Sequence, residues 1–176
     1  MILDGLGQLH QQYELLKERY FKLGAFDQER KKSIPSFPKR MGIITGAHSA
    51  AHADMHRTIQ ERWPLVESYD LLSLVQGEGA KHQLAQRIQE AQKMNLDIII
   101  LARGGGSIED LWAFNEPEVI DAILQSQVPI ITGIGHESDT TLSDLVSDYR
   151  AATPTAAIVA ALPSQIEIKQ KLRDYK

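Results

Sequence analysis

The sequence predicts an α/β fold with a doubly wound, mainly parallel sheet of about four to five strands. Two observations support this class. Short apolar runs alternate with longer segments of helical periodicity, which is the pattern of β-α-β units. One run, Ile98–Leu101, is apolar without interruption, as expected of a strand that is covered on both faces. In such sheets a ligand binds beyond the carboxyl ends of the strands.

The N-terminal segment has the periodicity of an amphipathic helix. Between Gly5 and Leu23, apolar and aromatic residues recur every three or four positions, and Gly24 suits the end of this helix. A charged stretch broken by Pro35 and Pro38 follows, which is typical of a linker. These boundaries divide the chain into an N-terminal helix and linker (1–38), an α/β core (39–162) and the start of a helical, coiled-coil extension (163–176).

Four buried strands and three connecting helices are predicted within the core. The strands are expected at Met41–Thr45, Tyr69–Val75, Asp97–Ala102 and Val128–Gly133. The helices are expected at Ser49–Trp63, Ala80–Met94 and Pro117–Gln125. Because crossovers between parallel strands are right-handed, this order gives a Rossmann-like sheet. The apolar run Ala156–Leu162 can then pack on the sheet, and Pro163 can open a short C-terminal helix.

Composition and charge exclude several functional classes. The chain has no cysteine, which excludes disulfides, thiolate metal sites and a cysteine nucleophile. No apolar run approaches the ~20 residues of a membrane span, and the first residues lack a signal-peptide pattern. We therefore expect a soluble cytoplasmic protein with no membrane partner. The net charge of -4 is uneven, since residues 95–150 hold 2 basic and 10 acidic residues, with Arg103 as the only interior cation.

A glycine loop follows the Ile98–Leu101 strand and is the first candidate binding site. Three glycines, Gly104, Gly105 and Gly106, let the backbone approach a ligand closely. Ser107 can cap a helix whose first amides attract phosphate, and Arg103 adds a charged, bidentate contact. The alternative is an ordinary flexible turn between a strand and a helix.

Two further loops follow strands at the same predicted edge of the sheet. After the Val128–Gly133 strand, His136 can exchange a proton near neutral pH, and Asp139 can orient it or bind a cation. Asp144 and Asp148 are spaced to share one helical face. A hydrogen-bonded structural turn is the alternative interpretation of this segment.

The loop after the first strand leads into a helix that is rich in histidine. His48, His52 and His56 recur every four residues, a spacing that can bind zinc, although partly buried and hydrogen-bonded histidines are the favoured interpretation. Asp54 points about 200° away from His52 around this helix, so one site that uses both is not expected.

Three runs of residues together resemble one family. They are Arg103–Asn115 (RGGGSIEDLWAFN), Gly135–Asp139 (GHESD) and Asp148–Thr155 (DYRAATPT). In this order and spacing they resemble the large subunit of exodeoxyribonuclease VII, over nearly the whole chain. The sequence departs from the usual pattern of that family at Gly46, Ala47, His52, His56 and Val159.

The resemblance implies a nuclease core that degrades single-stranded DNA from both ends to oligonucleotides, with a small helical subunit as partner. It maps the catalytic residues onto Asp54, Arg103, His136 and Asp139. Arg103 and the loop at 104–107 would bind the phosphate. A divalent metal cofactor is possible but not required. The core alone is expected to show weak or no activity, because only 6% of its residues are aromatic and a base-stacking surface is not evident.

Two alternatives to this nuclease remain open from the residues. One is a non-catalytic module that binds single-stranded DNA or nucleotides, in which the acidic residues serve only as caps and ion-pair partners. The other is a different phosphate-handling α/β enzyme. The lack of a Walker-type loop and of a complete Gly-x-Gly-x-x-Gly argues against the commonest enzymes of that second kind.

Overall fold

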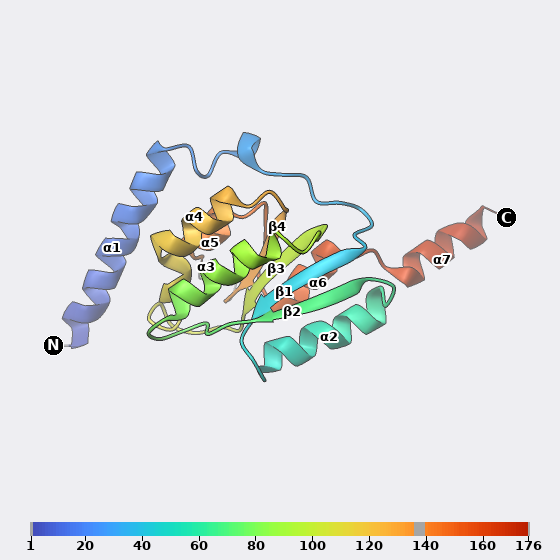
Figure 1. The fold of residues 1–176 in the computed structure, drawn as a ribbon, viewed down its shortest axis with the longest axis horizontal. Helices are drawn as coiled ribbons and strands as arrows, with labels where there is room; N and C mark the ends of the chain where they lie inside the picture. The colour runs from blue at the N-terminus through green and yellow to red at the C-terminus, as the bar shows by residue number, and fades with distance from the viewer. Residues whose placement is uncertain (1, 136–139, 176) are drawn as a thin grey trace.

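A computed structural model describes residues 2–135 and 140–175 of the chain. Over this part of the chain five strands form one all-parallel sheet in the order β2-β1-β3-β4-β5 (Figure 1). The strands are β1 (Arg40–Thr45), β2 (Glu67–Leu72), β3 (Ile98–Arg103), β4 (Ile130–Ile134) and β5 (Tyr149–Ala151). The predicted parallel α/β fold is therefore confirmed.

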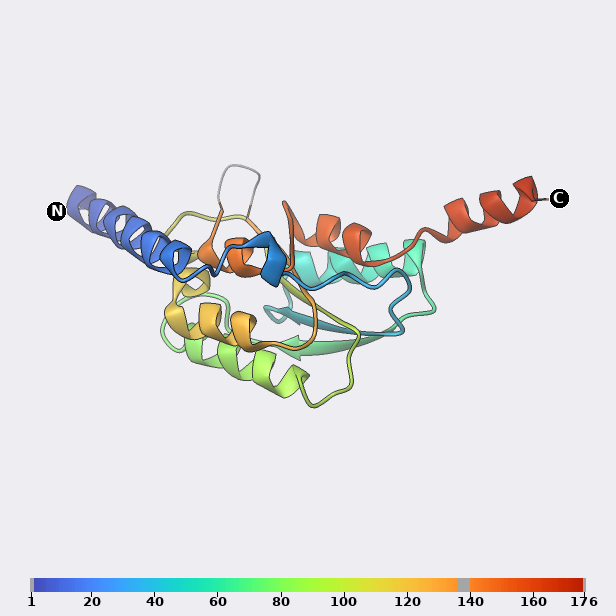
Figure 2. The ribbon, with the colours of Figure 1, turned by 90° about the horizontal axis from the view of Figure 1, so that it is seen from above.

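Helices cover both faces of the sheet, so the fold is doubly wound. Figure 2 shows α2 and α6 on one face, and α3 and α4 on the other. The helices are α1 (Ile2–Lys22), α2 (Ala50–Arg62), α3 (Ala80–Ala91), α4 (Pro117–Gln125), α5 (Leu142–Val146), α6 (Pro154–Ala161) and α7 (Gln165–Asp174), with short 3-10 helices η1 (Gln28–Arg30) and η2 (Trp112–Asn115). None of them combines the length and the apolar character needed to span a bilayer.

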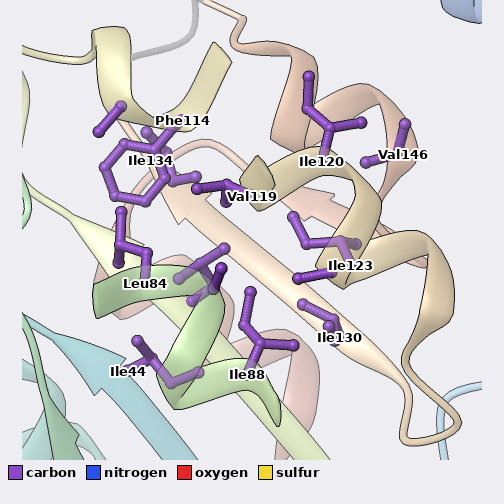
Figure 3. Packing of buried hydrophobic residues seen from close by; sticks show 14 of the residues in the cluster. Ile44, Leu84, Ile88, Phe114, Val119, Ile120, Ile123, Ile130, Ile134 and Val146 are labelled. Atoms are coloured by element: carbon purple, nitrogen blue, oxygen red, sulfur yellow. The ribbon is translucent and has the colours of Figure 1, made fainter. Parts of the chain in front are cut away.

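Alternation along the strands divides the buried residues between the two faces. Along β3, Ile99 and Leu101 pack with the cluster under α3 and α4, which also contains Phe114 and Ile120 (Figure 3). Ile98 and Ile100 pack on the opposite face with residues of α2 and α6. Since a β-strand alternates its side chains with period 2, the uninterrupted apolar run fills both cores at once.

Local sequence signals set where the helices begin. The Ser49 hydroxyl accepts a hydrogen bond from the His52 amide and caps α2. The Thr153 hydroxyl caps α6 in the same way, and proline stands at the start of both α4 and α6. Asn95 has φ 57°, a left-handed conformation that turns the chain between α3 and β3. The α-helix ends at Ala91 rather than at the predicted Met94, because the next three amides bond to carbonyls three residues back instead of four.

Two features of the sheet differ from the prediction. The strand expected at Tyr69–Val75 lies at Glu67–Leu72, because its register with β1 ends where Thr45 pairs with Leu72. The short strand β5 has no apolar run of its own, and it is a strand because it pairs with β4. Pairing over a long sequence separation decided both features.

The N-terminal segment contacts the core through specific side chains. Tyr20 is buried, and its hydroxyl donates to Asp121 Oδ1 at 3.0 Å. The Tyr13 hydroxyl donates to the carbonyl of Thr140 at 2.9 Å, and Lys31 Nζ donates to the carbonyl of Ser147 at 2.8 Å. The α7 helix, in contrast, has no buried residue. The division into three parts at 38/39 and 162/163 stays a prediction.

The order of the strands creates a switch point between β1 and β3. From β1 the chain continues outward to β2, whereas from β3 it continues in the opposite direction to β4 and β5. In doubly wound sheets the crevice beyond the carboxyl ends of such a strand pair is the usual ligand site. Thr45 and Arg103, the last residues of β1 and β3, lie at this position.

Candidate functional site

The three loops predicted from the sequence begin at one edge of the sheet. The loops follow β1, β3 and β4, which are adjacent and parallel. Arg103 is in register with Ile134, and the carbonyl of Arg103 accepts a hydrogen bond from the Gly135 amide at 3.2 Å. The glycine loop and the segment that leads to His136 therefore begin side by side.

Arg103 is fixed by its own loop and by a neighbouring one. Its Nη1 donates to the carbonyl of Gly104 at 2.8 Å and to that of Gly105 at 3.4 Å. Its Nη2 donates to Gln76 Oε1 in the loop after β2. The Nε atom is buried and has no hydrogen-bond partner among the described residues. The guanidinium is thus held in one orientation, and its Nε–H remains available to donate a hydrogen bond.

Thr45, at the end of the neighbouring strand β1, also has a buried polar atom without a hydrogen-bond partner among the described residues. The Thr45 side chain is buried, and its hydroxyl has no hydrogen-bond partner within residues 2–135 and 140–175. A buried polar group without a partner costs about 1–3 kcal/mol, so structures retain such groups mainly where a ligand, ion or water completes them. Two such groups end β1 and β3, at the switch point.

The segment after the glycines is a turn, and no α-helix begins there. The Ser107 amide donates to Asp110 Oδ2 at 3.1 Å, and the Asp110 amide donates to the Ser107 hydroxyl at 3.3 Å. The backbone hydrogen bond from Ser107 lowers the pKa of the Asp110 carboxyl. A helix start at Ser107 is thus a wrong expectation, because this reciprocal pair closes a turn that leads into η2.

Gly106 is required in this turn for steric reasons. A Cβ at this position would lie 2.9 Å from Arg103 Nη1 and 2.9 Å from Asp110 Cβ. Gly104, by comparison, has open space around it. The loop can therefore pack against the guanidinium only without a side chain at 106.

Asp54 lies on α2, in the second turn after its cap. Its carboxylate forms an ion pair with Arg57 at 3.2 Å, and its side chain is 46% exposed. Within the described residues Asp54 forms no hydrogen bond or ion pair with Arg103. Its catalytic role stays a prediction, as does that of Arg103.

Two of the four predicted catalytic residues, His136 and Asp139, lie outside the described residues. The chain on either side of them is described. Gly135 has φ 73°, a left-handed conformation that favours glycine. On the other side, the Leu142 amide donates to Asn115 Oδ1 at 2.8 Å. Asn115 is the last residue of η2, so this hydrogen bond connects the chain that follows the glycine loop to the start of α5.

Asp144 and Asp148 have structural roles and do not share a helical face. Asp144 lies inside α5, where its Oδ2 accepts from the Thr141 amide and forms a capping box. Asp148 lies beyond the end of α5. Its two oxygens accept from the amides of Lys32 and Ile130, at 2.7 and 2.8 Å. The expected shared face is absent because α5 ends at Val146.

Burial of Asp144 predicts a measurable pH dependence. Its side chain is fully buried, and this burial raises the pKa of the carboxyl despite the hydrogen bonds from Thr141 and the nearby charge of Arg150. A raised pKa favours the protonated carboxyl in the folded state. Its contribution to stability is therefore complete below the ordinary aspartate pKa and declines as the pH rises through the raised pKa. Asparagine stays neutral at every pH. We therefore expect the stability of Asp144→Asn, relative to the original chain, to increase as the pH rises from 4 to 7.

Urea unfolding of both proteins at pH 4 and at pH 7 measures the difference in their free energies of unfolding. The other carboxyl groups are the same in both proteins, so their pH dependence cancels. The matched variant Asp144→Ala leaves the buried Thr141 amide without its acceptor, and should lose about 1–3 kcal/mol at either pH. A stability difference between Asp144→Asn and the original chain that is the same at pH 4 and pH 7 would contradict the prediction.

Two histidines of α2 contact Asp70, a residue that no sequence motif indicates. His52 Nε2 lies 2.9 Å from Asp70 Oδ2, and His56 Nε2 lies 2.8 Å from Asp70 Oδ1. Burial raises the pKa of the Asp70 carboxyl, but the hydrogen bonds from both histidines outweigh it, so the net pKa is lowered. His48 is exposed on the preceding turn, where its φ of 54° is left-handed. His52 and His56 are partly buried and hydrogen-bonded, as expected from the sequence.

Gln76 is the second residue that the sequence did not single out. It contacts Arg103 although 26 residues separate them. A signal existed, because Gln76 directly follows the strand predicted at Tyr69–Val75, and the carboxyl ends of parallel strands share one edge. The order β2-β1-β3 nevertheless puts β1 between the two strands, so this contact depends on the path of the loop after β2.

The fold and this edge define the class of protein. It is a doubly wound parallel α/β protein whose switch point holds an oriented arginine, a glycine loop and two buried polar atoms without partners among the described residues. The chain matches the model of the family described as exonuclease VII, large subunit, over residues 25–176. It therefore belongs to the exonuclease VII large subunit family.

Curated relatives agree with this family. The chain is 50% identical over its whole length to the exodeoxyribonuclease 7 large subunit of Staphylococcus epidermidis strain RP62A. It is 51% identical over 98% of its length to that of Staphylococcus saprophyticus, and 49% identical over its whole length to that of Staphylococcus aureus strain Newman. The chain spans about 40% of the length of these relatives.

Proposed function

We propose that this chain forms the catalytic core of a nuclease that hydrolyses phosphodiester bonds of single-stranded DNA from both ends and releases oligonucleotides. The relatives are named exodeoxyribonuclease 7 large subunits, which supports the reaction class. The observation that supports this site most strongly is the oriented guanidinium of Arg103 at the switch point, with a buried Nε that lacks an acceptor among the described residues.

Arg103 is suited to hold the scissile phosphate. Three of its five donor hydrogens are engaged by Gly104, Gly105 and Gln76, which leaves Nε–H and one Nη2–H. These two hydrogens can point along one edge of a guanidinium, the fork that binds two oxygens of one phosphate. A phosphate oxygen would satisfy the buried Nε and recover its desolvation cost. The amides at 104–106 would add dipoles aimed at the same anion. The Ser107 amide is already bonded to Asp110 and would first have to be released.

The proton transfer is assigned to His136, with Asp54 and Asp139 orienting the imidazole or the attacking water. Proton transfer by one side chain typically supplies ~10²–10⁴-fold, so charge stabilisation by Arg103 and correct positioning must supply much of the remaining acceleration. The same two carboxylates are suitable ligands for a divalent ion that activates water. Cleavage with and without a chelator distinguishes the two mechanisms.

The proposed partners are single-stranded DNA and the small subunit of exonuclease VII, in the cytoplasm. The acidic balance of residues 95–150 disfavours strong DNA binding by the core itself. We therefore assign most of the DNA binding to parts of the enzyme outside this chain. We expect weak or no cleavage by the 176 residues alone.

A chimaera tests this function directly. Residues 1–176 replace the matching segment of the Staphylococcus epidermidis large subunit, and the product is purified with the small subunit. We expect degradation of single-stranded DNA labelled at either end, while the 176-residue chain alone gives at most a few per cent of that rate. The variant His136→Ala should lower the rate by ~10²–10⁴-fold.

The alternative, a non-catalytic DNA-binding module, predicts a different result. The chimaera would then bind single-stranded DNA without forming product, and His136→Ala would change neither property. Near-normal cleavage by the His136→Ala chimaera would refute the assigned proton transfer while leaving the nuclease assignment intact. Equal cleavage rates for the chain alone and the chimaera would refute the assignment of DNA binding to parts of the enzyme outside this chain.

A further inference from the structure

We propose that His52, His56 and Asp70 form a binding site for a zinc-like transition-metal ion that links α2 to the edge strand β2. One ligand atom from each of these residues lies within 4.8 Å of the others. None of them is among the residues assigned to DNA hydrolysis. The proposed metal site is therefore distinct from the residues assigned to hydrolysis.

The sequence and the sheet register together explain why the three side chains meet. His52 and His56 are four residues apart on α2 and project from the same side of the helix, the spacing by which two helical histidines bind one zinc ion. Asp70 is in register with Ile43, which packs in the cluster beneath α2. Because β2 is the edge strand, no further strand flanks the outer side of Asp70 within the described sheet.

The distances suit an ion after a small adjustment. The nitrogen and oxygen atoms now lie 2.8–3.1 Å apart, as hydrogen-bonded groups. Tetrahedral zinc, with bonds of about 2.0–2.2 Å, needs its ligand atoms about 3.3 Å apart. For these nitrogen–oxygen pairs the required opening is a few tenths of an ångström, and the two histidine nitrogens lie within 4.8 Å of each other. The two imidazole rings, 4.7 Å apart between centroids and perpendicular, are partly exposed and free to make it.

The donor set selects the class of ion and leaves room for a water. Two imidazole nitrogens and one carboxylate suit zinc and its neighbours, whereas magnesium and calcium prefer oxygen ligands only. The three side chains are 24–35% exposed, so solvent can reach the fourth position. A bound ion would replace the two histidine hydrogen bonds to Asp70 and hold the first half of α2 against the sheet.

A zinc titration of the purified 176-residue chain tests the proposal. After treatment with a chelator and its removal, zinc is added in competition with a chromogenic zinc indicator. We expect one zinc ion per chain, and no displacement by 1 mM magnesium. His52→Ala, His56→Ala and Asp70→Asn should each weaken zinc binding at least about tenfold. Asp70→Asn keeps the shape of the side chain, and circular dichroism confirms that every variant is folded.

Two other histidines serve as matched controls. His82 lies on α3, where its ring pairs with Glu118 at 2.6 Å, and His48 lies on the exposed turn before α2. His82→Ala and His48→Ala should leave zinc affinity unchanged. The proposal is refuted if the original chain binds no zinc, if the site variants bind it as tightly as the original chain, or if a control variant loses affinity equally.

Thermal unfolding provides a second measurement that does not depend on nuclease activity. Zinc at about one hundred times its Kd should raise the Tm of the original chain by about 5–10 °C, because the ion binds only the folded state. The same zinc concentration should leave the Tm of the double variant His52→Ala/His56→Ala unchanged. An equal rise in both proteins would show that zinc binds elsewhere.

Discussion

Replacing Arg103 with lysine is expected to lower single-strand cleavage by the chimaeric enzyme about 10²–10³-fold. Lysine keeps the positive charge but loses the planar fork that Gly104, Gly105 and Gln76 hold in one orientation. Losing one well-placed donor to developing charge has a cost of this size. The loss should appear mainly in kcat, because the lysine can still attract the phosphate as a point charge. Steady-state kinetics on end-labelled single-stranded DNA measure both parameters.

Arg87→Lys is the matched control for this experiment. Arg87 lies on α3, donates from Nε to the carbonyl of Leu72 and pairs with Glu90, so it also anchors local structure with a guanidinium. We expect its cleavage rate to stay within twofold of the original. If Arg103→Lys were as active as Arg87→Lys, the bidentate phosphate contact would be wrong and Arg103 would have only a structural role.

Gly133→Ala is expected to give the largest loss of stability among simple glycine substitutions, on the order of 3 kcal/mol. A Cβ at this position of β4 would lie 2.6 Å from the carbonyl oxygen of Thr153 and 3.0 Å from the Cα of Pro154. Both atoms belong to the backbone where α6 begins, so no side chain can move aside. The helix would have to lift from the sheet, or the strand would have to shift. Urea or thermal unfolding of the purified chain measures the loss.

Gly7→Ala is the opposite control. Gly7 lies within α1, and nothing lies within 4 Å of the position that a Cβ would take. Alanine is the better helix former, so this variant should be unchanged or more stable by up to about 1 kcal/mol. Equal stabilities for Gly133→Ala and Gly7→Ala would mean that the close approach of α6 to β4 is not tight in solution.

The packing at Gly133 gives the Thr153-Pro154-Thr155 run a structural role. Thr153 caps α6, and Pro154 fixes its first turn. The same two residues contact β4 two positions before Gly135, where the segment toward His136 begins. This motif therefore packs against the strand that leads into the proposed catalytic edge.

Interactions between distant residues limited what the sequence could predict about the site. The three loops were found because each follows an apolar run. The contact of Gln76 with Arg103 and that of Asp70 with His52 and His56 depend on strand order and register, which periodicity does not encode. The helix expected at Ser107 failed for a local reason, since the Ser107–Asp110 pair is equally compatible with a turn.

The sequence by itself determined the layers of this protein, the helices and buried strands within a few residues, and the loops at which chemistry is expected. These features follow from hydrophobic period and capping residues, which act over one or two turns. The tertiary structure alone decided which loops are neighbours, that Tyr149–Ala151 is a strand, and that Asp144 and Asp148 anchor structure. Those outcomes depend on which parts of the chain pair across the sheet, because a hydrogen bond between distant residues leaves no periodic signal in either segment.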